Sequence, residues 1–307
     1  MRLFSGICLI LLLVSLAGCS SLPQSGAQLP APTVEIRSTD TPQPGLTPSP
    51  TITLTPSPLP TSTPTDSPTA TLTATSTSTP VIVKAGDPVV VPVLLYHHIA
   101  QNDADIRYFV APDDFQTQMA ALVRLGYTTI PISKLVDVIK NGGELPARPV
   151  VITFDDGTED VYINAFPIMK AMDLTGALYI VVNRLGIKDF LSVGEVKEML
   201  AAGWEVGSHS MTHPNLLQSA NLSVEMYASR LKLEDELQIP IKTFAYPFGV
   251  IDPMIGRKAR IYGYEAAMGL GKSYTHTRNT LFYIDRLEIR HSTTMEMFIN
   301  MLPWKTP

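Results

Sequence analysis

Cysteine is nearly absent from this sequence, and both of its cysteines, Cys8 and Cys19, lie close to the N-terminus. The rest of the chain therefore has no thiols for a disulfide or for a thiolate metal site. Positive charge is also sparse, since the chain has 23 Lys and Arg residues but 28 Asp and Glu residues. The sequence contains no basic patch. This balance argues against a nucleic-acid partner. No Gly-x-Gly-x-x-Gly or Walker-type loop follows a predicted strand, so nucleotide binding has no support.

Aromatic residues are missing between Phe4 and Tyr96. From Ser38 to Pro80 the chain is almost entirely Thr, Ser and Pro. Such a segment has too little apolar surface to offset the entropy lost on ordering. Its repeated Thr-Pro and Ser-Pro steps favour extended polyproline geometry. We therefore expect a disordered Ser/Thr/Pro-rich linker over residues 19–87, followed by a folded domain over residues 88–307.

The single long apolar run lies at the N-terminus, from Ile7 to Leu16, shortly after Arg2. Its length suits a signal peptide better than a membrane span. The run ends in Leu16-Ala17-Gly18-Cys19, which resembles a bacterial lipobox. The resemblance implies a lipoprotein signal peptide over residues 1–18, lipidation of Cys19, export, and anchoring to the outer face of a bacterial cell membrane. The alternative is an ordinary signal peptide with an incidental cysteine.

The expected folded domain alternates between strand and helix patterns. Apolar, β-branched runs predict strands over residues 89–95, 127–130, 149–154, 177–182, 204–207, 243–247, 266–270 and 281–289. Helical spacing predicts helices over residues 112–125, 133–140, 159–172, 192–202, 222–237, 253–262 and 293–302. This rhythm is typical of an α/β fold with a parallel sheet. With about seven strands, a closed or nearly closed barrel is favoured over an open doubly wound sheet.

Two adjacent carboxylates, Asp155 and Asp156, follow the apolar strand 149–154 and precede Gly157. A fully apolar strand suits burial on both faces, and catalytic groups of such sheets gather beyond the C-terminal strand ends. A surface turn is the alternative for an isolated Asp-Asp-Gly. His209 and His213 follow the strand 204–207 and should lie at the same edge. Two histidines and one carboxylate make an open three-ligand metal site, which leaves the second carboxylate as a base.

These two stretches, Thr153-Phe154-Asp155-Asp156-Gly157 and His209-Ser210-x-x-His213, resemble the first two motifs of the polysaccharide deacetylases, the NodB-homology or carbohydrate esterase 4 family. The resemblance covers residues 91–301. It implies a distorted (β/α) barrel and metal-dependent removal of acetyl groups from a polymer that contains N-acetylglucosamine. It also implies that Asp155 is the general base. Asp156, His209 and His213 would hold a divalent metal, usually Zn²⁺.

The third motif of the family departs from its common form in Phe244-Ala245-Tyr246-Pro247-Phe248-Gly249. Ala245 stands where many relatives have the arginine that orients the base. Another residue must then take that role, and Arg286 is our hypothesis. Phe248 aligns with the aromatic residue whose backbone N–H serves as oxyanion donor. We expect the segment Tyr246-Pro247-Phe248 to contact the substrate.

The early Tyr96-His97-His98 resembles a subgroup that acts on poly-N-acetylglucosamine, in which the acid histidine lies on the first strand of the domain. The resemblance favours His97 as the acid. His98 is the rival, although on a strand it would face the other way. We rank His291 below both and expect no catalytic role for His276.

Trp204 opens its predicted strand, away from the catalytic edge, so core packing is favoured over sugar stacking. Three alternatives to the poly-N-acetylglucosamine substrate remain at this point. Two use the same site, in an acetyl xylan esterase or a peptidoglycan deacetylase. The third is a non-catalytic, tethered glycan-binding lipoprotein. We expect a monomer with a polysaccharide substrate, a membrane anchor at Cys19 and no nucleic-acid partner.

Overall fold

The computed structural model of the chain describes residues 79–102 and 107–306. The predicted signal peptide over residues 1–18, Cys19 and the linker up to residue 78 lie outside the described residues. They therefore stay predictions. In the described part of the chain, no helix has both the length and the apolar character that crossing a membrane requires.

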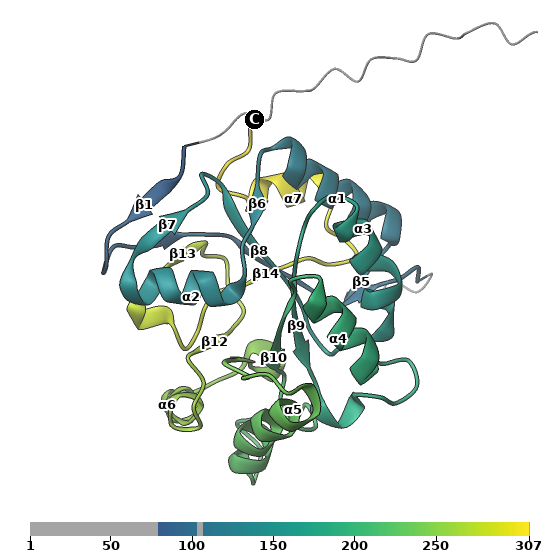
Figure 1. Cartoon of the computed structure of the whole chain (residues 1–307), viewed down its shortest axis with the longest axis vertical. Coiled ribbons are helices and arrows are strands. Elements are labelled where there is room, and N and C mark those ends of the chain that lie inside the picture. Colours follow the sequence, from purple (N-terminus) through teal and green to yellow (C-terminus); the bar gives the residue numbers. More distant parts are fainter. Residues whose placement is uncertain (1–78, 103–106, 307) are drawn as a thin grey trace, which may run out of the picture. The chain divides into compact units, whose positions relative to one another are not determined.

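A single parallel sheet of eight strands forms the centre of the domain (Figure 1). Its strand order is β12-β11-β10-β9-β8-β3-β14, and β6 pairs with β8 beside this path. The strands are β3 (Val93–Tyr96), β6 (Thr128–Thr129), β8 (Pro149–Phe154), β9 (Ala177–Ile180), β10 (Glu205–Ser208), β11 (Thr243–Ala245), β12 (Ala266–Met268) and β14 (Leu287–Glu288). Because all these pairings are parallel, the carboxyl ends of the strands lie at one rim.

The segment after β12 connects the two edges of this sheet. Expected as one strand over residues 281–289, it instead contains only the short β14, which pairs with β3. Upstream of β14, Ile284 N–H donates to the Ala267 carbonyl at 2.9 Å, and Gly269 N–H donates to the Ile284 carbonyl at 2.8 Å. One segment thus hydrogen-bonds to both edge strands, and the sheet curls into the distorted barrel that the sequence predicts.

Side chains alternate between the inside and the outside of the barrel along each strand. One hydrophobic cluster holds the inward residues, among them Val93, Val151, Tyr179 and Ala245. A second cluster holds their outward neighbours, among them Leu94, Ile152, Leu178 and Phe244. Helix α2 (Ile132–Asn141) packs into the inner cluster and closes the end of the barrel opposite the carboxyl rim.

The other helices surround the barrel (Figure 1). They are α1 (Pro112–Arg124), α3 (Phe166–Lys170), α4 (Val193–Ala201), α5 (Ser229–Leu237), α6 (Pro253–Ile261) and α7 (Met295–Met301). Helix α4 begins in a capping box, in which Ser192 and Glu195 bond each other's backbone N–H groups. The helix expected over residues 159–172 runs over residues 159–170, with a π-helical stretch at Val161–Ala165 and Pro167 in the first turn of α3 that follows it. Trp204 is 3% exposed and stacks on Phe154 at 5.4 Å, which confirms its core position.

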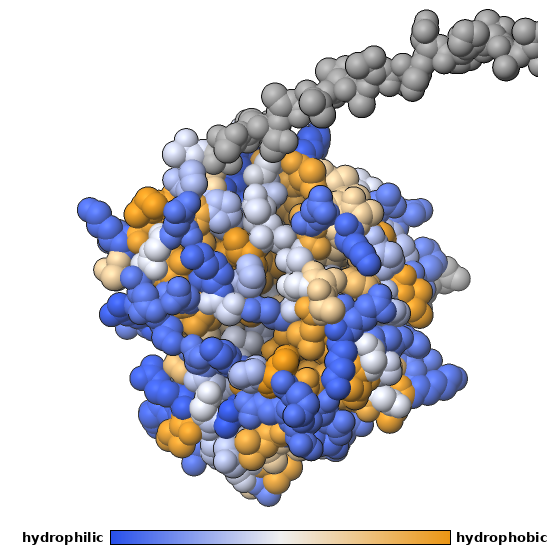
Figure 2. All heavy atoms as spheres, in the orientation of Figure 1, coloured by the Kyte–Doolittle hydropathy of each residue, from blue (hydrophilic) through white to orange (hydrophobic). Residues whose placement is uncertain are grey.

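Ordered structure begins upstream of Pro88, where we expected the domain to start. Strand β1 (Val81–Val83) pairs antiparallel with β7 (Gly143–Leu145). The three β-branched residues Val81-Ile82-Val83 suit a strand, whereas the Thr/Ser/Pro-rich composition ends at Pro80. Two small sheets complete the fold: β2 (Val89–Val90) with β13 (Thr275–His276), and β4 (His98–Ile99) with β5 (Phe109–Val110). Hydrophilic side chains cover much of the face in Figure 2, with hydrophobic areas between them.

Candidate active site

A cleft of about 260 Å³ opens at the carboxyl rim of the barrel. Its walls come from the ends of β3, β8, β10 and β11 and from the segment around β14. The lining side chains include those of His97, Tyr108, Asp155, Asp156, His209, His213, Tyr246, Phe248, Arg286 and Glu288. The rim therefore brings together the two carboxylates and the two histidines that the sequence placed at one edge of the sheet.

Asp155 and Arg286 form a buried ion pair beneath this cleft. Arg286 donates from Nη1 to Asp155 Oδ1 at 2.7 Å and from Nη2 to Oδ2 at 2.7 Å. The arginine is itself fixed, since its Nε donates to the Gly269 carbonyl at 3.1 Å. Burial by itself raises the pKa of Asp155, but the charges of Arg286 and His209 outweigh this effect and lower it to about 2. Arg286, our hypothesis for the residue that orients Asp155, thus contacts both of its carboxylate oxygens.

The ring of His209 is held by the backbone of the neighbouring strand. Its Nδ1 lies 2.8 Å from the Ala245 carbonyl oxygen, which fits an Nδ1–H donor. The opposite nitrogen, Nε2, lies 3.6 Å from Asp155 Oδ2 and faces the cleft. This contact selects the tautomer whose Nε2 lone pair is available to a ligand.

Asp156, His209 and His213 each bring one ligand atom into a cluster whose members lie within 4.8 Å of one another. His213 Nε2 is 3.6 Å from Asp156 Oδ1, which also accepts a hydrogen bond from Arg184 Nη1 at 3.1 Å. Burial lowers the pKa of His213 to about 4, so its ring is neutral at neutral pH. A neutral imidazole is the form that binds a metal.

Four non-glycine residues around the cleft have left-handed backbone conformations. Their φ angles are 70° at Asp156, 71° at Ser210, 65° at His213 and 60° at Phe248. Such conformations cost free energy in non-glycine residues and cluster at functional sites. Asp156 and Gly157 (φ 76°) are both left-handed, so the chain turns sharply as soon as β8 ends.

Glu225 holds the loop between the two histidines. Its carboxylate is buried and accepts hydrogen bonds from the backbone N–H groups of Met211 and Thr212 at 3.1 and 2.9 Å. The Thr212 hydroxyl adds a third bond at 2.8 Å, and the Ser210 hydroxyl accepts the His213 N–H at 2.8 Å. These bonds fix the strained turn that presents His213.

Strand alternation separates His97 from its neighbour His98. His97 lines the cleft together with Leu95, and its ring lies 4.6 Å from that of Tyr108. Among residues 79–102 and 107–306, its buried Nδ1 has no hydrogen-bond partner, and burial lowers the pKa of the ring. His98 instead bonds Asp160 Oδ2 at 2.6 Å and stacks on Phe109. Of the two histidines, only His97 lines the cleft together with Asp155 and Asp156.

Of the segment Tyr246-Pro247-Phe248, Tyr246 and Phe248 line the cleft, and they do so in different ways. Phe248 is 54% exposed, and its ring lies 4.7 Å from that of His213, so it offers a free aromatic face at the mouth of the cleft. Tyr246 is buried, and its hydroxyl donates to the Phe282 carbonyl at 3.0 Å. Pro247 is also buried.

The remaining histidines of the described chain lie away from the cleft. His276 is a buried strand residue whose Nε2 is 2.9 Å from the Val91 carbonyl oxygen. His291 is exposed, and its backbone N–H bonds the Arg107 carbonyl at 3.1 Å. Neither is among the side chains that line the cleft.

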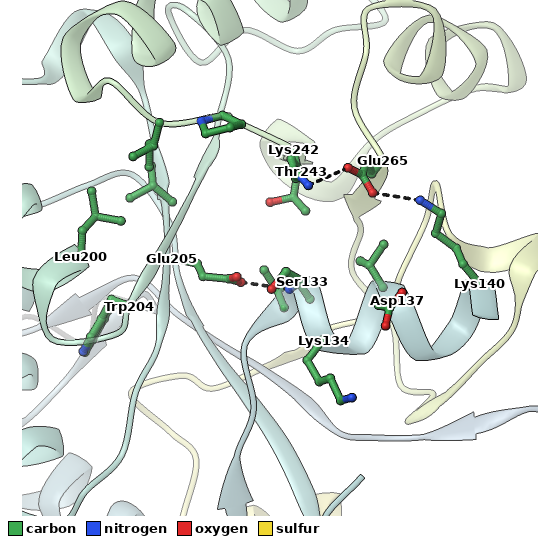
Figure 3. Close-up of a pocket in the computed structure, with 15 residues that line it drawn as sticks. Ser133, Lys134, Asp137, Lys140, Leu200, Trp204, Glu205, Lys242, Thr243 and Glu265 are labelled. Carbon is green, nitrogen blue, oxygen red and sulfur yellow. Dashed lines mark hydrogen bonds and ion pairs between the residues drawn. The ribbon is translucent and has the colours of Figure 1, made fainter. Parts of the chain in front are cut away.

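A larger cavity of about 640 Å³ lies at the opposite end of the barrel, between α2 and the first residues of β10 and β11 (Figure 3). Several of its polar groups are already paired with one another. Glu265 binds Lys140 at 2.9 Å and Lys242 at 3.1 Å, and Glu205 accepts the Ser133 N–H at 3.0 Å. None of the residues around Asp155 and His209 lines this cavity, so its size does not make it the catalytic centre.

Several side chains of the site were not identified from the sequence. Arg184 lies shortly after the end of β9. It could have been found by the rule that functional side chains gather beyond the C-terminal ends of parallel strands. Glu225, Arg107 and Tyr108 lie in segments without a motif, so pattern analysis gave no signal for them.

The family model for polysaccharide deacetylase matches residues 142–267 of this chain. A solved polysaccharide deacetylase from Bacillus cereus, BC0361, is 30% identical and superimposes with a TM-score of 0.63, covering 70% of this chain and 69% of that one. Streptococcus pyogenes deacetylase PplD, solved in complex with acetate, is 26% identical with a TM-score of 0.66. The match covers 70% of this chain and 99% of PplD.

Deacetylases also occur among the relatives found by sequence comparison. The poly-beta-1,6-N-acetyl-D-glucosamine N-deacetylase of Staphylococcus aureus (strain MRSA252) is 27% identical over 202 residues, which is 59% of this chain. The chain spans 68% of that enzyme and 62% of YxkH, a relative from Bacillus subtilis (strain 168).

Proposed function

Because the chain belongs to the polysaccharide deacetylase family, we propose that it hydrolyses N-acetyl groups of an extracellular polysaccharide that contains N-acetylglucosamine. The activity named for the staphylococcal relative supports this choice of polymer. The cleft supports the reaction class, since it combines a buried carboxylate, a cluster of potential metal ligands and a histidine.

Asp156, His209 and His213 have the chemistry of a divalent metal site and would hold Zn²⁺. Two imidazoles and one carboxylate are common ligands of catalytic zinc, and the set leaves further coordination positions open. The contact of His209 Nδ1 with the Ala245 carbonyl supports this assignment, because it orients Nε2 toward the cluster. A bound metal of this kind polarises the acetyl carbonyl and lowers the pKa of water.

Asp155 is our candidate general base. The bidentate contact with Arg286 keeps the carboxylate ionised and aims it at the cleft. An ionised carboxylate at this position would accept a proton from the attacking water. The pairing of Asp155 with Arg286, beside three potential metal ligands, is the observation that carries the proposed function.

His97 is our candidate acid for the leaving amine. Its ring lies in the same cleft as Asp155 and Asp156. Because Nδ1 is buried, a proton would pass to the leaving amine from Nε2. The Phe248 backbone N–H is our candidate oxyanion donor, in line with the third motif.

Acetate release from defined polymers tests the proposal. Full-length protein loaded with zinc should release acetate from poly-N-acetylglucosamine. Asp155→Asn should lower the rate about 100- to 10,000-fold, the usual loss for a general base, while keeping the bound metal. His291→Gln, an exposed change outside the cleft, serves as the matched control. Acetate release that survives Asp155→Asn would refute the mechanism, and release from acetylated xylan or peptidoglycan alone would reassign the polymer.

We further propose that the protein is exported and held at the membrane through a lipid on Cys19. The signal-peptide pattern over residues 1–18 and the lipobox-like Leu16-Ala17-Gly18-Cys19 support this. Metabolic labelling with a radioactive fatty acid should mark the wild-type chain and fail to mark Cys19→Ser. Labelling of the Cys19→Ser protein would refute lipidation at this position.

A further inference from the structure

The candidate active cleft adjoins a second cavity of about 470 Å³, and Glu288 lines both. The second cavity lies between the segment around β14 and helix α7, with Lys272, Tyr274 and Arg290 among its lining residues. A polymer has sugars on either side of the one that reacts. The second cavity is therefore placed to receive a neighbouring part of the chain whose acetyl group lies in the cleft.

Glu288 anchors two arginines at the border between these cavities. Its side chain is 9% exposed, whereas those of Arg107 and Arg290 are 47% and 49% exposed. Arg107 donates to Glu288 Oε2 from Nη2 at 2.5 Å, and Arg290 donates to the same oxygen from Nε at 2.6 Å. One recessed carboxylate thus holds two guanidinium groups at the surface, with one positive charge in excess.

The surplus of positive charge continues into the second cavity. Lys272 lines it, and Glu288 is the sole carboxylate among the described residues of its wall. Lys272 and Arg290 thus share a wall whose carboxylate, Glu288, is already bonded to two arginines, in a protein whose formal net charge is −5. Asp285 is not part of that wall, and its carboxylate accepts the Lys272 backbone N–H at 3.2 Å. A guanidinium has five N–H donors, and Arg290 bonds Glu288 through its Nε, which among the described residues leaves its terminal fork for a ligand. That fork matches carboxylate and phosphate groups.

We propose that Arg107, Lys272 and Arg290, arranged around Glu288, form a subsite for an acidic group of the polysaccharide. The preferred substrate would then carry a carboxylate or a phosphodiester near its N-acetylated sugar. This proposal rests on the proposed function, because it assigns a substrate class to the same cleft. A neutral N-acetylglucosamine homopolymer would leave the arginine fork without a charged partner.

Binding to oligosaccharides of matched length tests the subsite independently of catalysis. The probes are neutral chitohexaose, a hyaluronan hexasaccharide for carboxylates, and an N-acetylglucosamine 1-phosphate oligomer for phosphodiesters. Calorimetry with the full-length chain should show at least one acidic probe binding about ten-fold more tightly than chitohexaose at low ionic strength. This preference should disappear at about 0.5 M salt, where exposed charges are screened. The probe that binds more tightly identifies the acidic group.

The double variant Arg290→Gln/Lys272→Gln should abolish the preference for the acidic probe. The matched control is Arg124→Gln, which removes an exposed arginine from the last turn of α1. Equal binding of acidic and neutral probes, or a preference that persists in the double variant, would overturn the subsite. Acetate release is measured separately on all three probes. Release without a preference for acidic probes leaves the deacetylase function standing, whereas salt-sensitive binding without release supports the subsite and counts against that function.

Discussion

Arg286 binds both carboxylate oxygens of Asp155 at 2.7 Å, although 131 residues separate the two in the sequence. The arginine comes from the segment that connects the two edges of the barrel, and the aspartate from the end of the central strand β8. Closure of the barrel and orientation of the candidate base are therefore achieved by the same stretch of chain.

Replacing Arg286 should impair catalysis more than metal binding. Arg286→Lys keeps a positive charge but loses the planar fork that contacts both oxygens, so we expect a lower kcat with unchanged metal content. Arg286→Gln leaves Asp155 buried without a counter-charge and should destabilise the fold by about 3–5 kcal/mol. Acetate release, metal analysis and urea unfolding of each variant test this. An Arg286→Lys enzyme with the wild-type kcat would rule out the orienting role.

Removal of the metal ligands should abolish both metal binding and turnover. We expect one divalent metal per chain in the wild type and a large loss in His209→Ala and His213→Ala, since each removes one of three ligands. A chelator should inactivate the enzyme, and added Zn²⁺ should restore it. Elemental analysis checks the stoichiometry, with His291→Gln as the control that keeps its metal. Full metal content in His213→Ala would refute the ligand assignment.

The adjacent histidines should respond differently to substitution. His97→Ala should lower kcat about 100- to 10,000-fold, because the leaving amine loses its proton donor. His98→Ala removes the hydrogen bond to Asp160 and the stacking on Phe109, so it should cost about 1–2 kcal/mol of stability and leave kcat close to the wild type. Steady-state kinetics and thermal unfolding distinguish the two effects. A large loss of kcat in His98→Ala with a near wild-type kcat in His97→Ala would instead make His98 the acid.

Glu225 should control metal affinity without contacting the metal. Glu225→Ala frees the loop that carries His213, and we expect metal affinity to fall about 10- to 100-fold, as for other residues that support ligands. Titration against a chelating dye measures the affinity. Glu236→Ala removes an exposed carboxylate from α5 and is the control. Unchanged affinity in Glu225→Ala would show that the backbone conformation of the loop is fixed without it.

The ion pairs in Figure 3 should make stability sensitive to acid. Hydrogen bonds from Lys140 and Lys242 lower the pKa of Glu265 below its usual value of 4.5. Since the folded-state pKa is depressed, the pairs stabilise the protein above pH 4.5, and this stabilisation is lost as the pH falls through the folded-state value. In the double variant Lys140→Gln/Lys242→Gln, the free energy of unfolding should fall less on acidification than in the wild type. The difference should be less than about 1 kcal/mol, because these groups are partly exposed. Urea unfolding at several pH values, with Lys134→Gln as control, tests this.

The barrel and the position of the catalytic rim could be predicted because they depend on local patterns. Apolar runs such as the one before Asp155 define strands, and parallel strands place their ends together. The side on which His97 lies also follows from strand alternation. These features require no knowledge of which distant segments meet.

The contacts of Glu225, Arg107 and Glu288 were not predicted, since each depends on a long-range meeting of segments that carry no motif. The limits of the last strand were also missed. An apolar run over residues 281–289 does not show that its first half pairs with β12 and its second half with β3. Strand β1 was assigned to the linker because three valine and isoleucine residues beside a Thr/Pro-rich segment gave too short a signal.

The left-handed conformations of Asp156, Ser210, His213 and Phe248 set a limit on how far this protein can be stabilised by engineering. Glycine adopts such angles at little cost, so a selection for thermal stability would favour glycine at Asp156, His213 and Phe248. At Asp156 and His213 it would remove a candidate ligand, and at Phe248 the aromatic face at the mouth of the cleft. These three positions thus are where higher stability and catalytic activity make opposite demands on the residue.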